Sequence, residues 1–166
     1  MCIYENTIIC YSFSKSLSLA GERIGYISVS PKAYGERDVY NAICGAGRAL
    51  GYVCAPTLFQ HVICECLGKT ADLEIYRKNR DLIYKIMCDL GFECVKPQGA
   101  FYLFAKCPCD PDFFFEACKE EGILVVPSDT FGVKGYIRIA YCVATDTIER
   151  SVPHFKAVAK KCGLIK

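Results

Sequence analysis

Two apolar runs separated by a polar turn constrain the beginning of this chain more than any other feature. The first run, residues 7–14, is TIICYSFS, and the second, residues 23–30, is RIGYISVS. β-Branched and aromatic residues dominate both runs, which predicts two strands, and we expect the first of them to be buried. Pro31 ends the second run. The fold must therefore place the polar turn, with Lys15 at its start, at the end of an apolar strand.

Helical spacing replaces the strand pattern further along the chain. Residues 57–67 and 72–90 repeat apolar side chains every three or four positions, which predicts two amphipathic helices. Gly91 follows the second helix at the position where a glycine commonly ends one. Residues 31–51 have a mixed pattern, from which we predict no regular element.

Short elements alternate after residue 91. Residues 92–107 predict a strand pair with its corner at 97–99, and residues 109–122 predict a helix with Asp110 as the N-cap. Two further strands are expected in 123–128 and 136–143, and a last helix begins at residue 145. The aromatic side chains of residues 113–115 are expected in the core.

Composition excludes several classes of protein. Of the 166 residues, 52% are hydrophobic, so the chain can bury a core and is not disordered. The formal net charge is only +2, with charges of both signs interspersed, which does not indicate a nucleic-acid surface. No apolar run reaches the length of a membrane span, and the first residues lack the basic region of a signal peptide. We expect a cytoplasmic protein without a membrane partner.

Thirteen cysteines are scattered along the chain. The closest pairs are separated by one residue, and no pair has the spacing of a zinc knuckle or a redox motif. Most have apolar neighbours, as Cys10 and Cys88 do. We therefore expect reduced thiols in the core and no metal site.

The turn at Lys15 carries groups that suit a phosphate-bearing aldehyde. A lysine amine forms a covalent bond with an aldehyde carbon. Alternation along an extended segment would put Ser12 and Ser14 on one side, where their hydroxyls, with the guanidinium of Arg23, can bind a phosphate. Pyridoxal phosphate fits these groups. By residue types alone, a solvated loop lysine is the commoner explanation.

The order of these residues adds a resemblance. Residues 12–27, SFSKSLSLAGERIGYI, resemble the cofactor-lysine motif of the class I/II aminotransferases, which are fold-type-I pyridoxal-phosphate enzymes with the aspartate aminotransferase fold. The resemblance implies that Lys15 bonds to the cofactor and moves the substrate proton. It also implies that Ser12, Ser14 and Arg23 contact the cofactor phosphate.

Later segments agree with this family in order and spacing. Residues 97–104, PQGAFYLF, are similar to a strand of its small domain, and residues 122–141 resemble its ending, GILVVPSDTFG followed by GYIRIAY. The resemblance implies that Arg138 binds the substrate α-carboxylate. Alternation in the last strand also turns Arg138 away from its isoleucine neighbours, and a guanidinium suits a carboxylate. One departure is Ser128, which stands where the family usually has glycine.

The resemblance implies an α/β fold, namely the C-terminal part of a pyridoxal-phosphate-dependent transferase. Residues 1–50 would be a remnant of the large-domain sheet, 51–90 connecting helices, and 91–166 a small C-terminal α+β domain. In the family an aspartate that pairs with the cofactor's pyridine nitrogen lies before the cofactor lysine. We expect this chain to be a portion of a longer protein and to be inactive alone.

The implied activity is transfer of an amino group between an amino acid and a 2-oxo acid by a homodimer. A carbon–sulfur lyase or a decarboxylase of the same fold would share most of these motifs. A catalytically silent module that keeps the motif by descent is a third alternative. The substrate amino acid is not indicated by the sequence.

Overall fold

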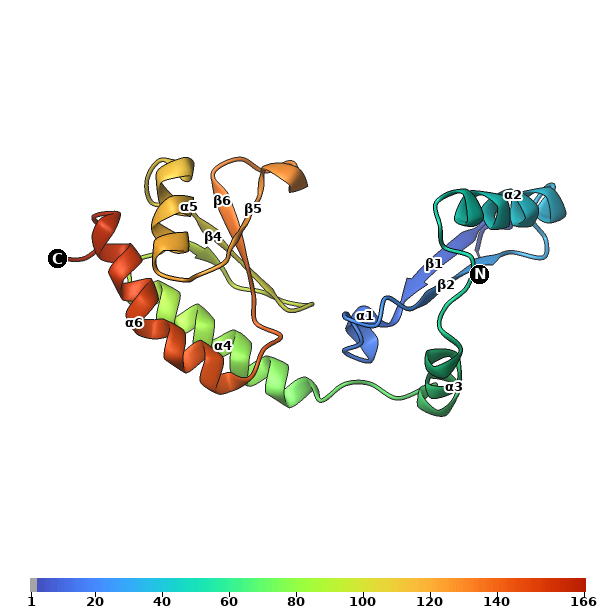
Figure 1. The fold of residues 1–166 in the computed structure, drawn as a ribbon, viewed down its shortest axis with the longest axis horizontal. Helices are drawn as coiled ribbons and strands as arrows, with labels where there is room; N and C mark the ends of the chain where they lie inside the picture. Colours follow the sequence, from blue (N-terminus) through green and yellow to red (C-terminus); the bar gives the residue numbers. More distant parts are fainter. Residues whose placement is uncertain (1–2) are drawn as a thin grey trace. The chain divides into compact units, whose positions relative to one another are not determined.

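The computed structural model describes residues 3–166, which form two compact units (Figure 1). The first unit ends at Ala71 and the second begins at Asp72. The elements of the first unit are β1 (Ile8–Ser12), α1 (Phe13–Ser16), β2 (Gly25–Val29), α2 (Glu36–Ala49) and α3 (Thr57–Cys66).

Strands β1 and β2 form an antiparallel ribbon in which Ile8 lies opposite Val29 and Ser12 lies opposite Gly25. Both strand predictions are confirmed. The prediction that β1 is buried is wrong, because four of its five residues are exposed. Within the described residues the sheet has only these two strands, so little covers its faces. Ile8, for example, is 50% exposed.

The first unit has a small core. Phe13, Ile24 and Ile63 are its buried hydrophobic residues. The helix predicted at residues 57–67 is confirmed as α3, but of its apolar side chains only that of Ile63 is buried. Helix α2 was not predicted, and it packs against β2 without burying a residue. Many large apolar side chains of this unit therefore remain exposed.

The second unit is an antiparallel sheet with helices packed on it. Its elements are α4 (Leu73–Asp89), β3 (Cys94–Val95), β4 (Tyr102–Lys106), α5 (Pro111–Glu120), β5 (Val126–Pro127), η1 (Asp129–Phe131), β6 (Tyr136–Ala140) and α6 (Thr145–Lys161). The strand order is β3-β4-β6-β5, and each neighbouring pair is antiparallel. The predicted hairpin at residues 92–107 is confirmed as β3 and β4, whereas the strand expected at 123–128 is only two residues long.

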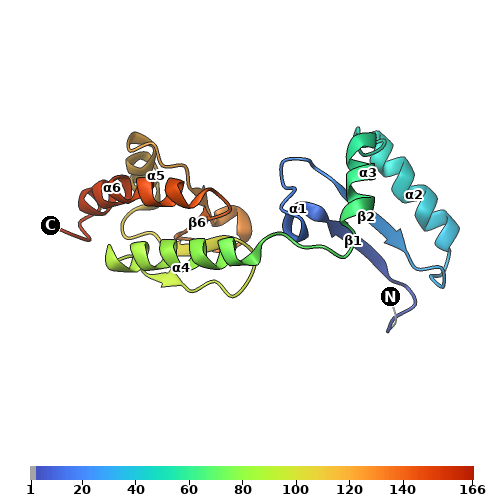
Figure 2. The same cartoon turned by 90° about the horizontal axis from the view of Figure 1, so that it is seen from below.

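Helices α4 and α6 lie side by side, and α5 packs on α6 (Figures 1 and 2). Each of the two long helices has 17 residues. No helix in residues 3–166 is long and apolar enough to cross a membrane. The core of the unit is a single cluster of apolar side chains that includes Met87, Leu103, Phe114, Ile137 and Val158, all fully buried.

Local signals set the ends of the helices as expected. The Asp110 side chain accepts a hydrogen bond from the Phe113 amide at 3.1 Å, which caps α5. The Asp72 side chain caps α4 in the same way, through the amide of Glu74 at 2.9 Å. Gly91, after α4, has a φ of 86°, the left-handed conformation of a helix stop.

The aromatic run at residues 113–115 is only partly in the core. Phe114 is fully buried, Phe115 is half-buried, and Phe113 is 52% exposed. Successive positions on a helix point about 100° apart, so three consecutive side chains cannot all face one core.

The boundary between the compact units lies inside the segment predicted to connect two domains. Helix α3 belongs to the first unit, whereas α4 belongs to the second because Ile83 and Met87 are buried in the second core. The division into 1–50, 51–90 and 91–166 concerns the domains of a longer protein, and it stays a prediction.

The prediction that the cysteines are mostly core residues is wrong. Cys2 lies outside the described residues. Of the twelve described cysteines, which are all free thiols, only Cys118 is buried, and Cys10 and Cys88 are exposed. Burial raises the pKa of the Cys118 thiol to about 12, so this thiol stays protonated at neutral pH. Apolar sequence neighbours did not predict burial because the ribbon that holds Cys10 has little cover.

Candidate active site

The Lys15 turn begins where β1 ends. The Ser12 side chain accepts a hydrogen bond from the Ser14 amide at 3.2 Å and thereby caps α1. The Ser12 hydroxyl also donates to the Ser14 hydroxyl, at 2.9 Å. The expectation of an extended segment is therefore wrong after Ser12, because residues 13–16 form one helical turn. The two hydroxyls are adjacent because of the cap and not because of alternation.

The pairing of β1 with β2 brings the segment that contains Arg23 back beside this turn. The Phe13 amide donates to the Ile24 carbonyl at 3.1 Å, which extends the ribbon by one pair beyond Ser12 and Gly25. Arg23 directly precedes Ile24 and has a φ of 54°, in the left-handed region that costs a non-glycine residue energy. Its guanidinium donates to the Ala20 carbonyl at 2.9 Å.

Burial differs among these predicted site residues. Ser14 is buried, with 8% of its surface exposed, whereas Ser12, Lys15 and Arg23 are exposed. The buried Ser14 hydroxyl is thus hydrogen-bonded to the Ser12 hydroxyl, and solvent can reach the nearby Lys15 and Arg23 side chains. Hydroxyl and guanidinium donors of this kind can bind an anionic group, and the amine can react with a carbonyl.

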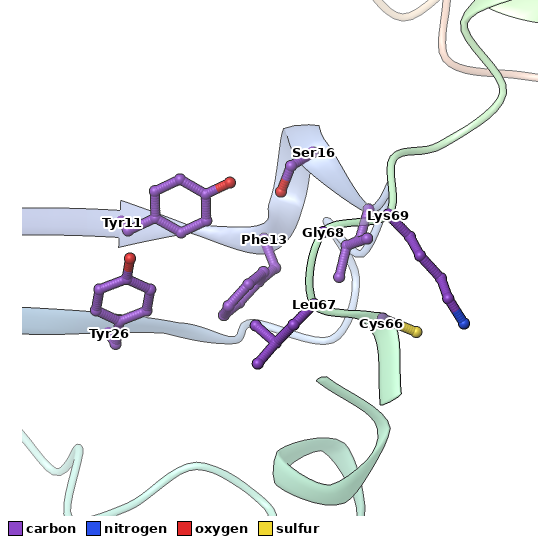
Figure 3. A pocket seen from close by; sticks show the side chains of 9 residues that line it. Tyr11, Phe13, Ser16, Tyr26, Cys66, Leu67, Gly68 and Lys69 are labelled. Carbon is purple, nitrogen blue, oxygen red and sulfur yellow. The ribbon is translucent and has the colours of Figure 1, made fainter. Parts of the chain in front are cut away.

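A hollow of about 260 Å³ lies beside the same turn (Figure 3). Its lining residues are Tyr11, Phe13, Ser16, Leu17, Tyr26, Cys66, Leu67, Gly68 and Lys69. The rings of Tyr11 and Tyr26 stack with their centroids 5.3 Å apart, and the Lys69 side chain extends away from them (Figure 3). None of the predicted site residues lines this hollow, so it is not the predicted cofactor site.

Arg138 lies on β6 in the second unit, with its side chain on the face opposite that of Ile137 and Ile139. These two isoleucines are buried and Arg138 is half-buried, which confirms the predicted alternation. The Arg138 Cζ lies 4.3 Å from the centroid of the Tyr102 ring and 4.2 Å from that of Phe131. In residues 3–166 no carboxylate forms an ion pair with it, so two rings rather than an acid hold this cation.

Comparison with known proteins decides the family. A profile of the family described as aminotransferase class I and II matches residues 3–155, which is nearly the whole chain. The chain belongs to the class I/II aminotransferases. Its match corresponds to the C-terminal portion of the family, and its α/β architecture is that of the aspartate aminotransferase fold.

Individual aminotransferases resemble the chain over almost its full length. The crystal structure of an amino transferase from Eubacterium rectale is 51% identical, has a TM-score of 0.79, and is matched over 96% of this chain and 40% of that one. Aspartate aminotransferase of Bacillus subtilis is 32% identical over 95% of this chain and 42% of its own length. Aromatic-amino-acid aminotransferase 2 of Thermococcus litoralis is 29% identical over 98% and 43%. The chain therefore spans less than half the length of these relatives.

The glycine of the aminotransferase motif at 23–25 has a steric explanation. A Cβ on Gly25 would lie 2.3 Å from the Tyr11 carbonyl oxygen, which is part of the backbone and cannot rotate away. We expect Gly25→Ala to destabilise the first unit by about 1–3 kcal/mol, because the ribbon must separate to accept the methyl group. Hydrogen exchange at the Phe13 amide, which bonds across the ribbon, measures the effect.

Gly21→Ala is the matched control for that substitution. Gly21 lies in the same turn, and a Cβ there would meet nothing within 4 Å. In the Gly21→Ala variant, the Phe13 amide should exchange at the wild-type rate. Equal exchange rates in the two variants would contradict the steric explanation.

Sequence reasoning missed the two rings that flank Arg138. Tyr102 lies diagonally across from Arg138, since Phe104 is directly opposite Arg138 and the next same-face position of β4 is Tyr102. The alternation FYLF in residues 101–104 could have indicated this face. Phe131 reaches Arg138 from the 3₁₀ turn η1, and no local pattern indicates that contact.

The structure also bears on metal binding. Within residues 3–166, no three side chains of His, Cys, Asp or Glu lie close enough together to hold a metal ion.

Proposed function

We propose that this chain is part of a pyridoxal-phosphate-dependent aminotransferase that transfers an amino group between an amino acid and a 2-oxo acid. The observation that carries the proposal is the hydrogen-bonded Ser12–Ser14 pair next to Lys15, on a ribbon that brings the Arg23 segment back to it. The family membership supports the same activity.

The residues at this turn fit the cofactor in their chemistry. The Ser12 and Ser14 hydroxyls can donate to phosphate oxygens. Arg23 carries five N–H donors, of which one is engaged with the Ala20 carbonyl in the described structure. When bound, pyridoxal phosphate supplies an aldehyde that bonds to an amine and a ring that withdraws electrons from the substrate.

Lys15 is the proposed catalytic residue. Its Nζ would hold the cofactor covalently, and after release it would accept the proton that leaves the substrate Cα and return it later, acting as general base and then general acid. An exposed lysine at the end of a helical turn can make this movement, because its side chain is not packed in the core. Arg138 would bind the substrate α-carboxylate through the N–H edge of its guanidinium.

The exposed apolar surface of the first unit supports a larger assembly. Eight of its large apolar side chains are more than half exposed over residues 27–67: Ile27, Tyr34, Tyr40, Leu50, Tyr52, Val53, Leu58 and Leu67. A soluble protein rarely exposes so much apolar surface without a partner for it. We attribute the missing cover to the remainder of a full-length aminotransferase and propose a cytoplasmic homodimer, and we propose the 1–50, 51–90 and 91–166 division as its domain boundaries.

Absorbance spectroscopy tests the role of Lys15. Adding pyridoxal phosphate to the chain should produce the visible absorbance band of a lysine-bound pyridoxal cofactor, and Lys15→Ala should abolish it. Lys32→Ala removes another lysine of the first unit and is the matched control, which should keep the band. A band that persists in Lys15→Ala, or no band in the wild-type chain, would favour a catalytically silent module.

A further inference from the structure

Ser128 is the residue at which the chain departs from the aminotransferase resemblance, which leads us to expect glycine, and it makes several hydrogen bonds within its own loop. It is fully buried. Its amide donates to the Tyr136 carbonyl at 3.0 Å, and its carbonyl accepts from the Phe131 amide at 2.8 Å. A glycine could make both of these backbone bonds.

The Ser128 side chain adds two bonds that a glycine cannot make. Its hydroxyl donates to the Val133 carbonyl and accepts from the Tyr136 amide at 3.0 Å. These contacts join the start of the 128–136 loop to its middle and its end. The loop geometry does not require a glycine at this position either, because the Ser128 φ is −84°, an ordinary value. The Ser128 side chain therefore stabilises the conformation of the 128–136 loop.

Phe131 is the residue of this loop that contacts Arg138. The Phe131 ring lies 4.2 Å from the Arg138 Cζ, and Tyr102 lies 4.3 Å away from the neighbouring strand. Tyr102 is held by β4, which pairs with β6 over five residues. Phe131 has no such support and is 46% exposed, so its position depends on the loop.

We infer that Ser128 is a positioning residue for Arg138. Ser128 stabilises the 128–136 loop and thereby keeps the Phe131 ring against the Arg138 guanidinium. The N–H edge of Arg138 is therefore already oriented before a substrate carboxylate binds. Preorganisation of this kind raises affinity, because less side-chain freedom is lost on binding. The inference rests on the proposed role of Arg138 in carboxylate binding.

NMR spectroscopy of the isotope-labelled full chain tests the inference. The Arg138 Hε and Hδ resonances report the shielding by the flanking rings, and a titration with pyruvate reports carboxylate affinity at the same residue. We expect Ser128→Gly to shift the Arg138 resonances toward their unshielded values. Pyruvate affinity should fall about two- to fivefold, the range for loss of one cation–π contact at a partly exposed site.

Two further variants keep the test decisive. Ser151→Ala is the matched control, because the Ser151 hydroxyl also donates to a backbone carbonyl, that of Ile148, but lies far along the chain on α6. It should change neither signal. Phe131→Leu removes the ring while leaving Ser128 in place, and it should reproduce both effects even if Ser128→Gly proves too unstable to study.

The outcomes separate this inference from the proposed function. Unchanged Arg138 resonances and pyruvate affinity in Ser128→Gly would overturn the inference. Unchanged values in Phe131→Leu would overturn it too. A wild-type chain in which pyruvate moves the Arg138 resonances no more than its uncharged methyl ester does would instead contradict the proposed role of Arg138. The shielding of the Arg138 resonances by the two rings would still report whether Ser128 positions the Arg138 side chain.

Discussion

Replacing Phe114 with alanine is expected to destabilise the second unit by about 3–5 kcal/mol, the usual cost of deleting a buried aromatic side chain. Phe114 is fully buried in the largest core of the protein, where its ring packs edge-on against Phe92 at a centroid distance of 6.1 Å. Alanine would leave a cavity that the helices and the sheet cannot fill without moving. Urea denaturation followed by circular dichroism measures the loss.

The neighbouring Phe113 provides the control. It belongs to the same helix and has the same side chain, but it is 52% exposed. Phe113→Ala should therefore change the free energy of unfolding by no more than about 0.5 kcal/mol. A similar loss in both variants would contradict the assignment of the core face of α5.

Replacing Asn79 with leucine is the second substitution from which we expect a large effect. Asn79 is fully buried on α4, and its amide nitrogen donates to the Tyr141 carbonyl at 3.1 Å and to the Val143 carbonyl at 2.8 Å. Its side-chain oxygen accepts from the Thr145 hydroxyl at 2.8 Å. The side chain thus joins α4 to the segment between β6 and α6.

Leucine would fill the space but leave these carbonyls without donors. Each buried group that loses its partner costs about 1–3 kcal/mol, so the total should approach that of Phe114→Ala. Asn79→Asp should be at least as destabilising, because a carboxylate would face two carbonyl oxygens. Thr145→Val removes one bond only and should cost about 1 kcal/mol. If Asn79→Leu unfolds at the wild-type urea concentration, the segment is held by other contacts.

Local sequence rules predicted much of the second unit. An aspartate cap, a proline in the first turn and a glycine after the last turn set the ends of α5, because each acts on backbone groups within a few residues. The β3–β4 pair and α4 followed from turn residues and spacing in the same way. Helix α2 was missed although Val39, Ile43 and Ala46 have helical spacing, because Gly45 and Gly47 lie within it and glycine disfavours a helix interior.

Burial could not be predicted by the same rules. The apolar pattern of β1 is that of a covered strand, but cover comes from elements distant in the sequence or outside the chain. The error at Cys10 has the same origin. Cys88 is exposed for another reason, because it follows the buried Met87 on α4 and successive helix positions point about 100° apart. Burial depends on the tertiary neighbours of a strand or a helix, and a local pattern does not specify them.

The candidate site was predicted in its residues but not in its geometry. The serines, Lys15 and Arg23 were identified from a motif, whereas the cap that brings the two hydroxyls together is a short-range hydrogen bond within one turn. The rings that flank Arg138 depend on strand register and on the 128–136 loop. Register and loop conformation follow from the whole unit, so the sequence motif could not supply them.

Mapping the covalent attachment of pyridoxal phosphate tests the central claim most directly. The chain is incubated with the cofactor, the lysine–cofactor bond is reduced with borohydride, and the labelled peptides are identified by mass spectrometry. We predict label on Lys15 in preference to Lys32 and Lys69. The amount of label on Lys15 should fall when pyridoxal is used in place of pyridoxal phosphate. It should also fall in Arg23→Gln, which weakens phosphate binding. Label spread evenly over the lysines, and equal with and without the phosphate, would contradict the assignment of this turn as the cofactor site.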